Sequence, residues 1–320
     1  MKKLVVVLLV AVLALSAVFA EGGSEKKYPN DSINVIVHAA AGGGSDTMAR
    51  MVANMVQQDL GVPVVVDNKG GAGGSIAFTY VSKAKTDGYT IGTAATEIAY
   101  VSGLGYATIC PDDVQFLGNA VSWAGCLAVG KDSPYQTFED FLADAKKRPG
   151  EISVGNSSTG SIWHFGSATM QQVCGIKVND VPFDGAAGEV TGLLSKQADA
   201  FVIGTNEIRA TVESGDARVL AVFNDHRAEI YPDVPTAAEY GYPIKNTVWV
   251  GFLAPKGINE EAKNVLVAAI KKAVCSDEFA QFCKDRGYEQ TYLDPEAYKQ
   301  LADTDRENYL AIIKEFGLGQ

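Results

Sequence analysis

The chain has 320 residues, enough for about two domains that each bury a core. Hydrophobic residues make up 47% of it and charged residues 20%, which excludes a wholly disordered chain. The 27 Lys and Arg residues against 38 Asp and Glu residues give a net charge of −11, and a chain this acidic repels phosphate backbones. We therefore exclude nucleic acid as its main partner.

The first twenty residues have the pattern of a secretory signal peptide. Lys2 and Lys3 give a basic start, residues 4–15 form an unbroken apolar run, and Val18 and Ala20 place small residues at the −3 and −1 positions of a cleavage site. Because the run is short for a membrane span, we favour cleavage after residue 20 over an N-terminal anchor. No Cys follows the cleavage point, so no lipid anchor is expected and the predicted location is the periplasm.

Strand, glycine-rich turn and helix alternate through the first part of the mature chain. Runs of β-branched residues predict the strands, and apolar residues spaced three and four apart predict the helices. The predicted elements are a strand over 33–37, a helix over 46–60, a strand over 63–66, a helix over 75–84 and a strand over 90–94.

A second unit of the same kind follows an apolar stretch over 116–129. It repeats the order of strand, small-residue loop and helix, and two long helices are predicted to end the chain. The predicted elements are helices over 138–147 and 162–173, strands over 152–154, 200–203 and 219–222, an apolar segment over 247–253, and helices over 260–274 and 295–316.

Strands that alternate with helices of these lengths predict parallel, doubly wound sheets, and therefore an α/β fold of two lobes. We expect lobe 1 to comprise residues 21–122 and 250–320, and lobe 2 to comprise residues 123–249, with chain crossings near 120–130 and 245–255. A central cleft is expected where the glycine loops of the two lobes face each other, at the carboxyl ends of the strands.

The five cysteines are too few and too scattered for a disulfide-built scaffold. We place Cys275 and Cys283 on one helix, where their sequence separation corresponds to roughly 12 Å, beyond the reach of a disulfide. No cluster of Cys and His residues occurs, so neither a zinc site nor any other cofactor is expected.

Two loops have the composition of an anion site. Residues 42–46 (Gly-Gly-Gly-Ser-Asp) and 157–161 (Ser-Ser-Thr-Gly-Ser) each precede a predicted helix, one in each lobe. Free N–H groups and the macrodipole at a helix N-terminus attract an anion without Lys or Arg. Ordinary capping by Ser45, Asp46 and Ser161 is the alternative for either loop alone, but two matched loops favour a binding site.

Enzyme signatures are missing from the sequence. It contains no dinucleotide fingerprint, phosphate loop or nucleophile elbow, and its three histidines are far apart. A hydrolase that uses His164 with Ser157 or Ser161 would lack an acid to orient the histidine, which makes an enzyme the less favoured class. His38 borders the first glycine loop and His164 lies one turn into the helix after the second, so both are candidate site residues.

Short motifs occur in a fixed order along the whole mature chain. They are 28–29 (YP), 41–46 (AGGGSD) with Ala49 and Arg50, 60–68 (LGVPVVVDN), 71–74 (GAGG), 87–90 (DGYT), 149–150 (PG), 160–161 (GS) with His164, 181–185 (VPFDG), 231–236 (YPDVPT) and 249–251 (WVG). Each motif is weak alone, but their common order argues against chance agreement. Together they resemble the receptor component of the tripartite tricarboxylate transporters, the TctC or Bug family.

The resemblance implies a type II periplasmic-binding fold that closes over a small carboxylate, held largely by backbone N–H groups and bridging waters. At His38 and Ala39 the sequence departs from the Pro-Phe pair that is usual in the family. Together with His38, the ligand-binding residues implied by position are Ala39, Ala40, Gly42, Gly43, Gly44, Ser45, Asp46, Thr93, Thr96, Ser157, Ser158, Thr159, Gly160, Ser161, His164, Asp184, Gly185 and Ala186.

We therefore predict an exported receptor that captures a small organic carboxylate, such as citrate or another di- or tricarboxylate. It is expected to deliver this ligand to a permease with one large and one small integral-membrane subunit. We expect a monomer that needs no cofactor and catalyses no reaction. The alternatives are a secreted subunit that senses a ligand and signals to a partner protein and, less favoured, the secreted hydrolase.

Overall fold

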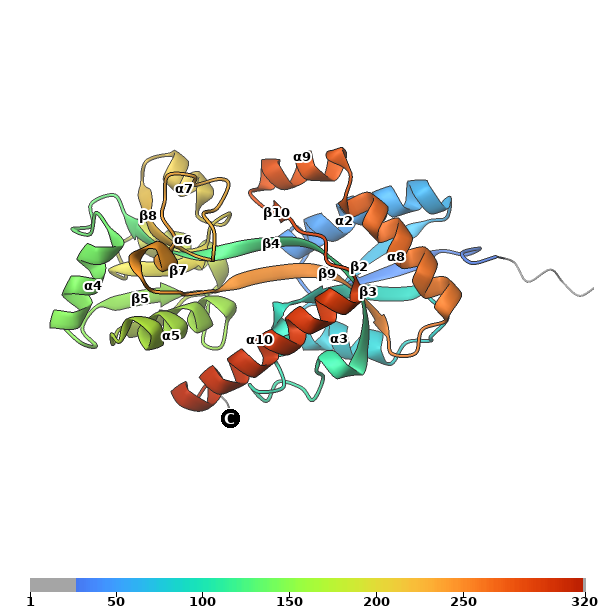
Figure 1. Cartoon of the computed structure of the whole chain (residues 1–320), viewed down its shortest axis with the longest axis horizontal. Helices are drawn as coiled ribbons and strands as arrows, with labels where there is room; N and C mark the ends of the chain where they lie inside the picture. Colours follow the sequence, from blue (N-terminus) through green and yellow to red (C-terminus); the bar gives the residue numbers. More distant parts are fainter. Residues whose placement is uncertain (1–26, 319–320) are drawn as a thin grey trace, which may run out of the picture.

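The computed structural model describes residues 27–318, so the predicted signal peptide and its cleavage site lie outside the described residues. Two α/β halves lie along the longest axis of the molecule, joined by the long strands β4 (Val114–Gly130) and β9 (Thr247–Pro255) (Figure 1). The described residues form one ten-stranded sheet in the order β2-β1-β3-β9-β4-β7-β5-β6, and β8 and β10 pair with β4. We keep the names lobe 1 and lobe 2 for the halves built around β1–β3 and β5–β7.

Lobe 1 begins with the predicted alternation of strands and helices. β1 pairs in parallel with β2 on one side and β3 on the other, and Gly61 ends the first helix in the left-handed conformation at φ 70°. The elements are β1 (Ile33–Val37), α2 (Gly44–Leu60), β2 (Val64–Asn68), α3 (Ser75–Ser82) and β3 (Thr90–Ala95), with short 3-10 turns over Ala72–Gly74, Thr96–Ala99 and Pro111–Asp113.

Lobe 2 repeats this arrangement. β5 pairs in parallel with β6 and β7, as β1 does with its two neighbours. The elements are α4 (Phe138–Lys147), β5 (Ser153–Asn156), α5 (Ile162–Cys174), β6 (Asn179–Pro182), α6 (Gly185–Leu194), β7 (Ala200–Gly204), α7 (Arg209–Glu213), β8 (Ala217–Phe223) and a 3-10 turn over Ala237–Tyr240.

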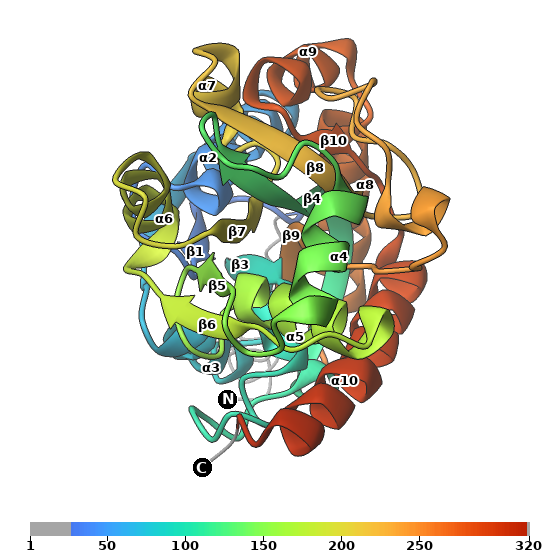
Figure 2. The same cartoon turned by 90° about the vertical axis from the view of Figure 1, so that its left-hand side faces the viewer.

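The C-terminal segment returns to lobe 1 as α8 (Glu260–Val274), α9 (Asp277–Arg286), β10 (Glu289–Gln290) and α10 (Pro295–Phe316). α10 also reaches lobe 2, where its end runs alongside α5 (Figures 1 and 2). The ring of Tyr309 on α10 lies 5.2 Å from that of Tyr100 and 5.0 Å from that of Phe165 on α5. This cluster of three aromatic rings packs the two lobes against each other on one side of the crossing strands.

Strand β4 changes partners where it leaves lobe 1. Its residues up to Ala124 pair with β9, and its residues from Gly125 onward pair with β7 and β8. A Cβ atom on Gly125 would lie 2.7 Å from Oδ1 of Asn246 and 3.0 Å from the ring of Trp163, so only glycine fits at this point. The crossings predicted near 120–130 and 245–255 are therefore two antiparallel strands, whereas the prediction specified only parallel sheets.

One prediction about the C-terminal helices is wrong. Cys275 and Cys283 do not share a helix, because α8 ends at Val274 and Ser276 starts α9, its side chain accepting a hydrogen bond from the N–H of Phe279. Apolar periodicity alone suggested one continuous helix, but a serine that caps a new helix breaks it here. All five cysteines are free.

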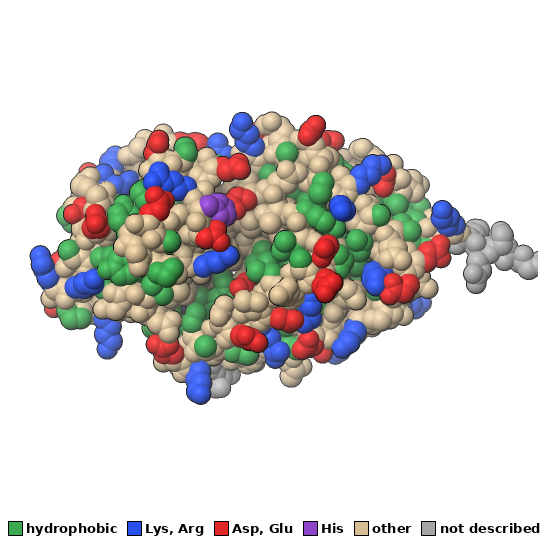
Figure 3. Space-filling model, viewed as in Figure 1, with side chains coloured by type: hydrophobic (Ala, Val, Ile, Leu, Met, Phe, Trp, Pro, Cys, Tyr) green, Lys and Arg blue, Asp and Glu red, His purple; other side chains and the backbone are tan. Residues whose placement is uncertain are grey.

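Among the residues described, no helix combines the length and the hydropathy needed to cross a membrane. On the face shown in Figure 3, acidic and basic side chains are interspersed, and hydrophobic side chains are visible in the hollow between the lobes. The excess negative charge is thus spread over this face and not gathered in one patch.

We predict that Gly251→Ala destabilises the fold by about 1–3 kcal/mol, because the added methyl group overpacks the contact between β9 and β4. A Cβ at Gly251 would lie 2.2 Å from the carbonyl oxygen of Gly118. Gly130→Ala at the end of β4 is the control, since its Cβ would be no closer than 3.7 Å to any neighbour. Denaturant unfolding of both variants checks this, and equal losses of stability would contradict the packing argument.

Candidate functional site

A cavity of about 470 Å³ lies between the lobes at the carboxyl ends of their parallel strands. His38 follows β1, Ala95 ends β3, Ser157 follows β5 and Glu207 follows β7 by three residues. This is where an open α/β sheet leaves room for a ligand, since the loops after neighbouring strands diverge there. Both lobes contribute to the wall, so a ligand in this cavity would contact both.

The lining residues fall into three groups. Those of lobe 1 are His38, Ser45, Ala72, Gly73, Ala95, Glu97, Tyr100 and Tyr106; those of lobe 2 are Ser157, Ser158, Thr159, Gly160, Ser161, Ile162, Trp163, Gly185, Ala186 and Glu207; and Trp123 and Val248 come from the crossing strands.

The structure brings about half of the predicted site residues to this cavity. The predicted residues that line it are His38, Ser45, Ser157, Ser158, Thr159, Gly160, Ser161, Gly185 and Ala186. The predicted residues that do not line it are Ala39, Ala40, Gly42, Gly43, Gly44, Asp46, Thr93, Thr96, His164 and Asp184. Most of the second group lie in the same loops as the first, and two of them, Thr93 and His164, hydrogen-bond directly to the lining residues His38 and Gly160.

Asp46 shows this supporting role. The N-cap of α2 is Gly43, which has no side chain to cap with, and Asp46 instead accepts hydrogen bonds from the N–H of Gly42 (2.8 Å), from Nε of Arg50 (3.0 Å) and from Nδ2 of Asn68 (2.9 Å). Burial opposes ionisation of this carboxyl, but these hydrogen bonds outweigh it and hold the pKa of Asp46 below its ordinary value. Asp46 thereby fixes the glycine turn of lobe 1 from behind.

His38 links that turn to the neighbouring strand. Its Nδ1 lies 2.7 Å from Oγ1 of Thr93, and its Nε2 lies 3.3 Å from Oγ of Ser45. Burial lowers the pKa of His38 to about 4. The ring is therefore neutral at pH 7 and supplies no positive charge to the cavity.

The second predicted loop is held by its own helix. Ser161 is the N-cap of α5, as predicted, and its side chain accepts a hydrogen bond from the N–H of His164 (3.2 Å). Nδ1 of His164 accepts the N–H of Gly160 (3.0 Å), which occupies one donor that the loop could otherwise offer to an anion. Burial, opposed in part by Asp180, lowers the pKa of His164, so this ring is also neutral at pH 7.

The N–H groups of Ile162 and Trp163 lie in the first turn of α5, where a helix supplies no acceptor of its own. Both residues line the cavity. This end of the helix, together with its positive dipole, is suited to a carboxylate.

Sequence reasoning missed two acidic residues, Glu97 and Glu207. Oε2 of Glu207 accepts hydrogen bonds from Nε1 of Trp163 (2.8 Å) and from the N–H of Gly204 (3.0 Å), and Oε2 of Glu97 is buried with no hydrogen-bond partner. Burial raises the pKa of Glu97 to about 7, and it also raises the pKa of Glu207. Each lies just beyond the carboxyl end of a predicted strand, and this position was the sequence signal that could have identified them as site residues.

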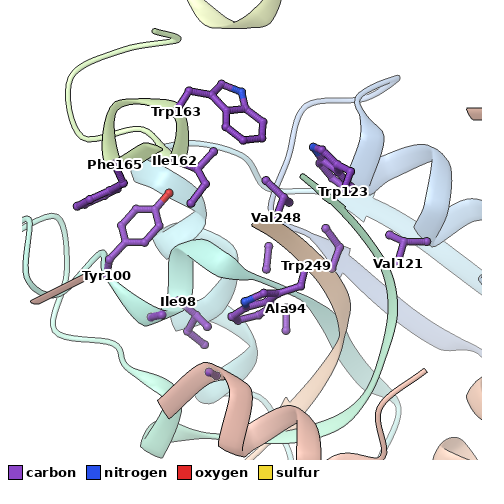
Figure 4. Close-up of a cluster of buried hydrophobic side chains, with 14 of the residues drawn as sticks. Ala94, Ile98, Tyr100, Val121, Trp123, Ile162, Trp163, Phe165, Val248 and Trp249 are labelled. Carbon is purple, nitrogen blue, oxygen red and sulfur yellow. The ribbon is translucent and has the colours of Figure 1, made fainter. Parts of the chain in front are cut away.

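The missed aromatic residues form much of the remaining wall. Tyr100, Tyr106, Trp123 and Trp163 all line the cavity, and the ring of Trp123 packs against that of Tyr288, with centroids 5.2 Å apart and planes tilted by 30°. In Figure 4 the side chains of Trp123 and Trp163 lie on either side of a gap above Val248. These residues are scattered in sequence and meet only through the crossing strands and α5.

A second cavity, of about 810 Å³, lies on the other face of the crossing strands. Ser122 and Trp249 line it, whereas their chain neighbours Trp123 and Val248 line the first cavity, as the alternation of side chains along a strand requires. It is bordered by His226, whose Nε2 lies 3.2 Å from a carboxylate oxygen of Glu289. This cavity does not lie at the carboxyl ends of the parallel strands, so we assign the candidate site to the first.

The chemistry of the lining residues is that of binding. Within the described part of the chain, no group of His, Cys, Asp and Glu is arranged to hold a metal ion. The ring of His164 is hydrogen-bonded to the backbone of Gly160, not to a serine hydroxyl, so the pairing required by a hydrolase is not formed. The fold and the site define a two-lobed solute-binding protein.

The chain belongs to the tripartite tricarboxylate transporter family of receptors, TctC, whose family model matches residues 48–318. Protein BugT of Bordetella pertussis is 28% identical over 313 residues, which covers 96% of this chain and 96% of that protein. The members of this family are periplasmic solute-binding receptors and not enzymes.

Solved structures agree with this assignment and confirm the type II periplasmic-binding fold. A TctC solute-binding protein from Polaromonas, crystallised without ligand, is 31% identical, with a TM-score of 0.80 over 90% of this chain and 100% of that one. The R. palustris protein Rpa4515 with adipate is 25% identical, with a TM-score of 0.79 over 91% of this chain and 99% of that one.

The raised pKa of Glu97 predicts a specific pH dependence of stability. Because the pKa rises from 4.5 to about 7 on folding, the wild type loses stability as pH increases from about 5 to 8. Glu97→Gln removes this loss, so the variant should gain on the wild type over that range, by at most about 3 kcal/mol. Thermal unfolding at several pH values measures the difference.

Glu239→Gln is the control, because the pKa of Glu239 is shifted in the opposite direction. The hydrogen bond from Arg227, with those from Thr236, lowers the pKa of Glu239 to about 2, so this carboxylate stabilises the wild type at neutral pH and the substitution should be unfavourable there. A constant stability difference between Glu97→Gln and wild type from pH 5 to 8 would contradict the burial of Glu97.

Proposed function

We propose that the chain is an exported receptor that captures a small organic carboxylate in the cavity between its lobes and delivers it to a membrane permease of one large and one small subunit. Residues 1–20 would be removed as a signal peptide, leaving the mature receptor in the periplasm. Family membership and the adipate in one relative support the ligand class. The same proposal includes lobe boundaries at 122/123 and 249/250, which fall within the crossing strands β4 and β9.

The observation that carries this proposal is the wall made by residues 157–161 and the first turn of α5. It combines hydroxyl groups, the free N–H groups of Ile162 and Trp163 and the positive end of a 13-residue helix. We assign the carboxylate to this wall. The predicted residues that line the cavity are proposed as ligand contacts, and those behind it as supports for the loops.

Binding is proposed to close the lobes around the ligand. The crossing strands confine the change in backbone angles to a few residues, and Gly125 and Asn246 lie where both strands pass between the lobes. Across the mouth of the cavity the lobes already approach each other, since a Cβ on Gly160 of lobe 2 would lie 3.1 Å from Cδ1 of Leu104 of lobe 1.

The test is calorimetric titration of the mature protein with adipate, succinate, glutarate, citrate, aspartate and glutamate, followed by solution X-ray scattering with the member that binds. We expect binding at neutral pH and a smaller radius of gyration at saturation. A scattering profile that stays unchanged when calorimetry shows the site to be full would contradict closure, and failure of every acid to bind would contradict the proposed ligand class.

A pair of glycine variants controls for nonspecific damage. Gly160→Ala and Gly175→Ala both force alanine into a left-handed conformation, at φ 76° and 62°, and each should cost about 1–3 kcal/mol of stability. Only the methyl group at Gly160 meets the other lobe, because a Cβ on Gly175 has no neighbour within 4 Å. Gly160→Ala should therefore weaken binding of the acid several-fold more than Gly175→Ala does.

A further inference from the structure

The cavity contains two carboxylates in equivalent places of the two lobes. Glu97 lies two residues beyond β3, and Glu207 lies three residues beyond β7. Each of these strands is the third member of a parallel trio, β2-β1-β3 in lobe 1 and β6-β5-β7 in lobe 2. The pseudo-symmetry of the fold thus directs one acidic side chain into the cavity from each side.

No positive side chain balances this pair. The lining includes neither Lys nor Arg, and its one histidine, His38, is neutral because burial lowers its pKa to about 4. The charge of Glu207 further raises the pKa of Glu97, as expected of two like charges near each other. An unpaired buried carboxylate is energetically costly, so a ligand with a positive charge would stabilise these two side chains.

Hydrogen bonds within the described residues do not occupy all the acceptor atoms of these carboxylates. One oxygen of Glu207, Oε2, orients the Trp163 ring and accepts the N–H of Gly204, but no described residue hydrogen-bonds its Oε1. Oε2 of Glu97 is buried and has no hydrogen-bond partner among the described residues. A purely structural role accounts for Oε2 of Glu207 and leaves Oε2 of Glu97 unexplained.

A buried donor without a partner lies on the same wall. The side chain of Trp123 is only 7% exposed, it lines the cavity, and its Nε1 makes no hydrogen bond. In Figure 4 this nitrogen lies on the side of the ring that faces Trp163, across the gap between the lobes. The cavity therefore presents free acceptors and a free donor together, between aromatic rings whose faces favour a nearby cation.

We propose that the ligand is a small amino carboxylate, whose protonated amino group is bound by Glu97 and Glu207 while its carboxylate is bound by Trp123 and the loop 157–161. This inference rests on the proposed function and narrows its ligand class. A ligand with two or three carboxylates and no amino group would bring more negative charge beside two acidic side chains. An ammonium group offers three donors and the missing positive charge.

Matched pairs of acids that differ only in an amino group test the inference. The mature protein is titrated by calorimetry at pH 8 with glutamate and glutarate, aspartate and succinate, 6-aminohexanoate and hexanoate, and phenylalanine and 3-phenylpropanoate. We expect the amino member of at least one pair to bind tenfold or more tightly than its partner. Glu97→Gln should reduce the affinity for that amino acid at least tenfold and should not reduce the affinity for its partner.

Glu189→Gln is the matched control, because Glu189 is fully buried but does not line the cavity. Melting curves establish that both variants are folded. Acids that bind as tightly as their amino counterparts, or more tightly, in every pair that binds would overturn this inference and leave the proposed function standing. If no member of any pair binds, the proposed function itself is contradicted.

Discussion

The hydrogen bond between the N–H of Gly125 and the carbonyl oxygen of Asn246, at 2.8 Å, holds the two crossing strands together where they pass from one lobe to the other. The same asparagine donates from its backbone to Phe223 (2.9 Å) and from its side chain to the carbonyl oxygen of Ile162 (3.0 Å). The first residue of α5 is thereby tied to the crossing itself. The helix end that we assign to the ligand carboxylate is positioned by this junction, and glycine at 125 is what permits so close an approach.

The walls of the cavity are electrostatically unusual for a receptor of anions. Both nearby histidines are neutral because burial lowers the pKa of each, and the N–H of Gly160 is used within the loop. Attraction for a carboxylate thus depends on a small number of backbone and indole donors in a site of low dielectric, where each is worth more than in water. The two acidic side chains oppose a second negative group, which is the basis for the amino carboxylate that we propose.

The sequence predicted the elements that depend on local pattern. β1, α2, α4, α8 and α10 follow from β-branched runs, apolar periodicity and good caps, and their ends differ by at most two residues from the prediction. The elements β6, α6, α7 and β10 and the break between α8 and α9 were missed. β6, α7 and β10 are too short to carry a clear period, α6 contains three glycines, and a single serine cap decides the break. The antiparallel crossing was also missed, since pairing partners far apart in sequence leave no mark on local composition.

The candidate site was predicted only as loops. The loop 157–161 was found because small polar residues before a helix leave free N–H groups, and all five of its residues line the cavity. In the loop 39–46 only Ser45 does so; Ala40, Ala41 and Gly42 are exposed, and the side chain of Asp46 points to Asn68 and Arg50. Glu97 and Glu207 follow predicted strands, but their meeting with Trp123 could not be predicted from sequence, since it requires both lobes to be in place.

A crystal structure of the mature protein with the ligand that it retains during purification tests the central claim most directly. The account predicts electron density between the lobes, with a carboxylate within hydrogen-bond distance of the loop 157–161 and the first turn of α5. Density instead in the cavity on the other face of the crossing strands, beside His226 and Tyr288, would contradict it.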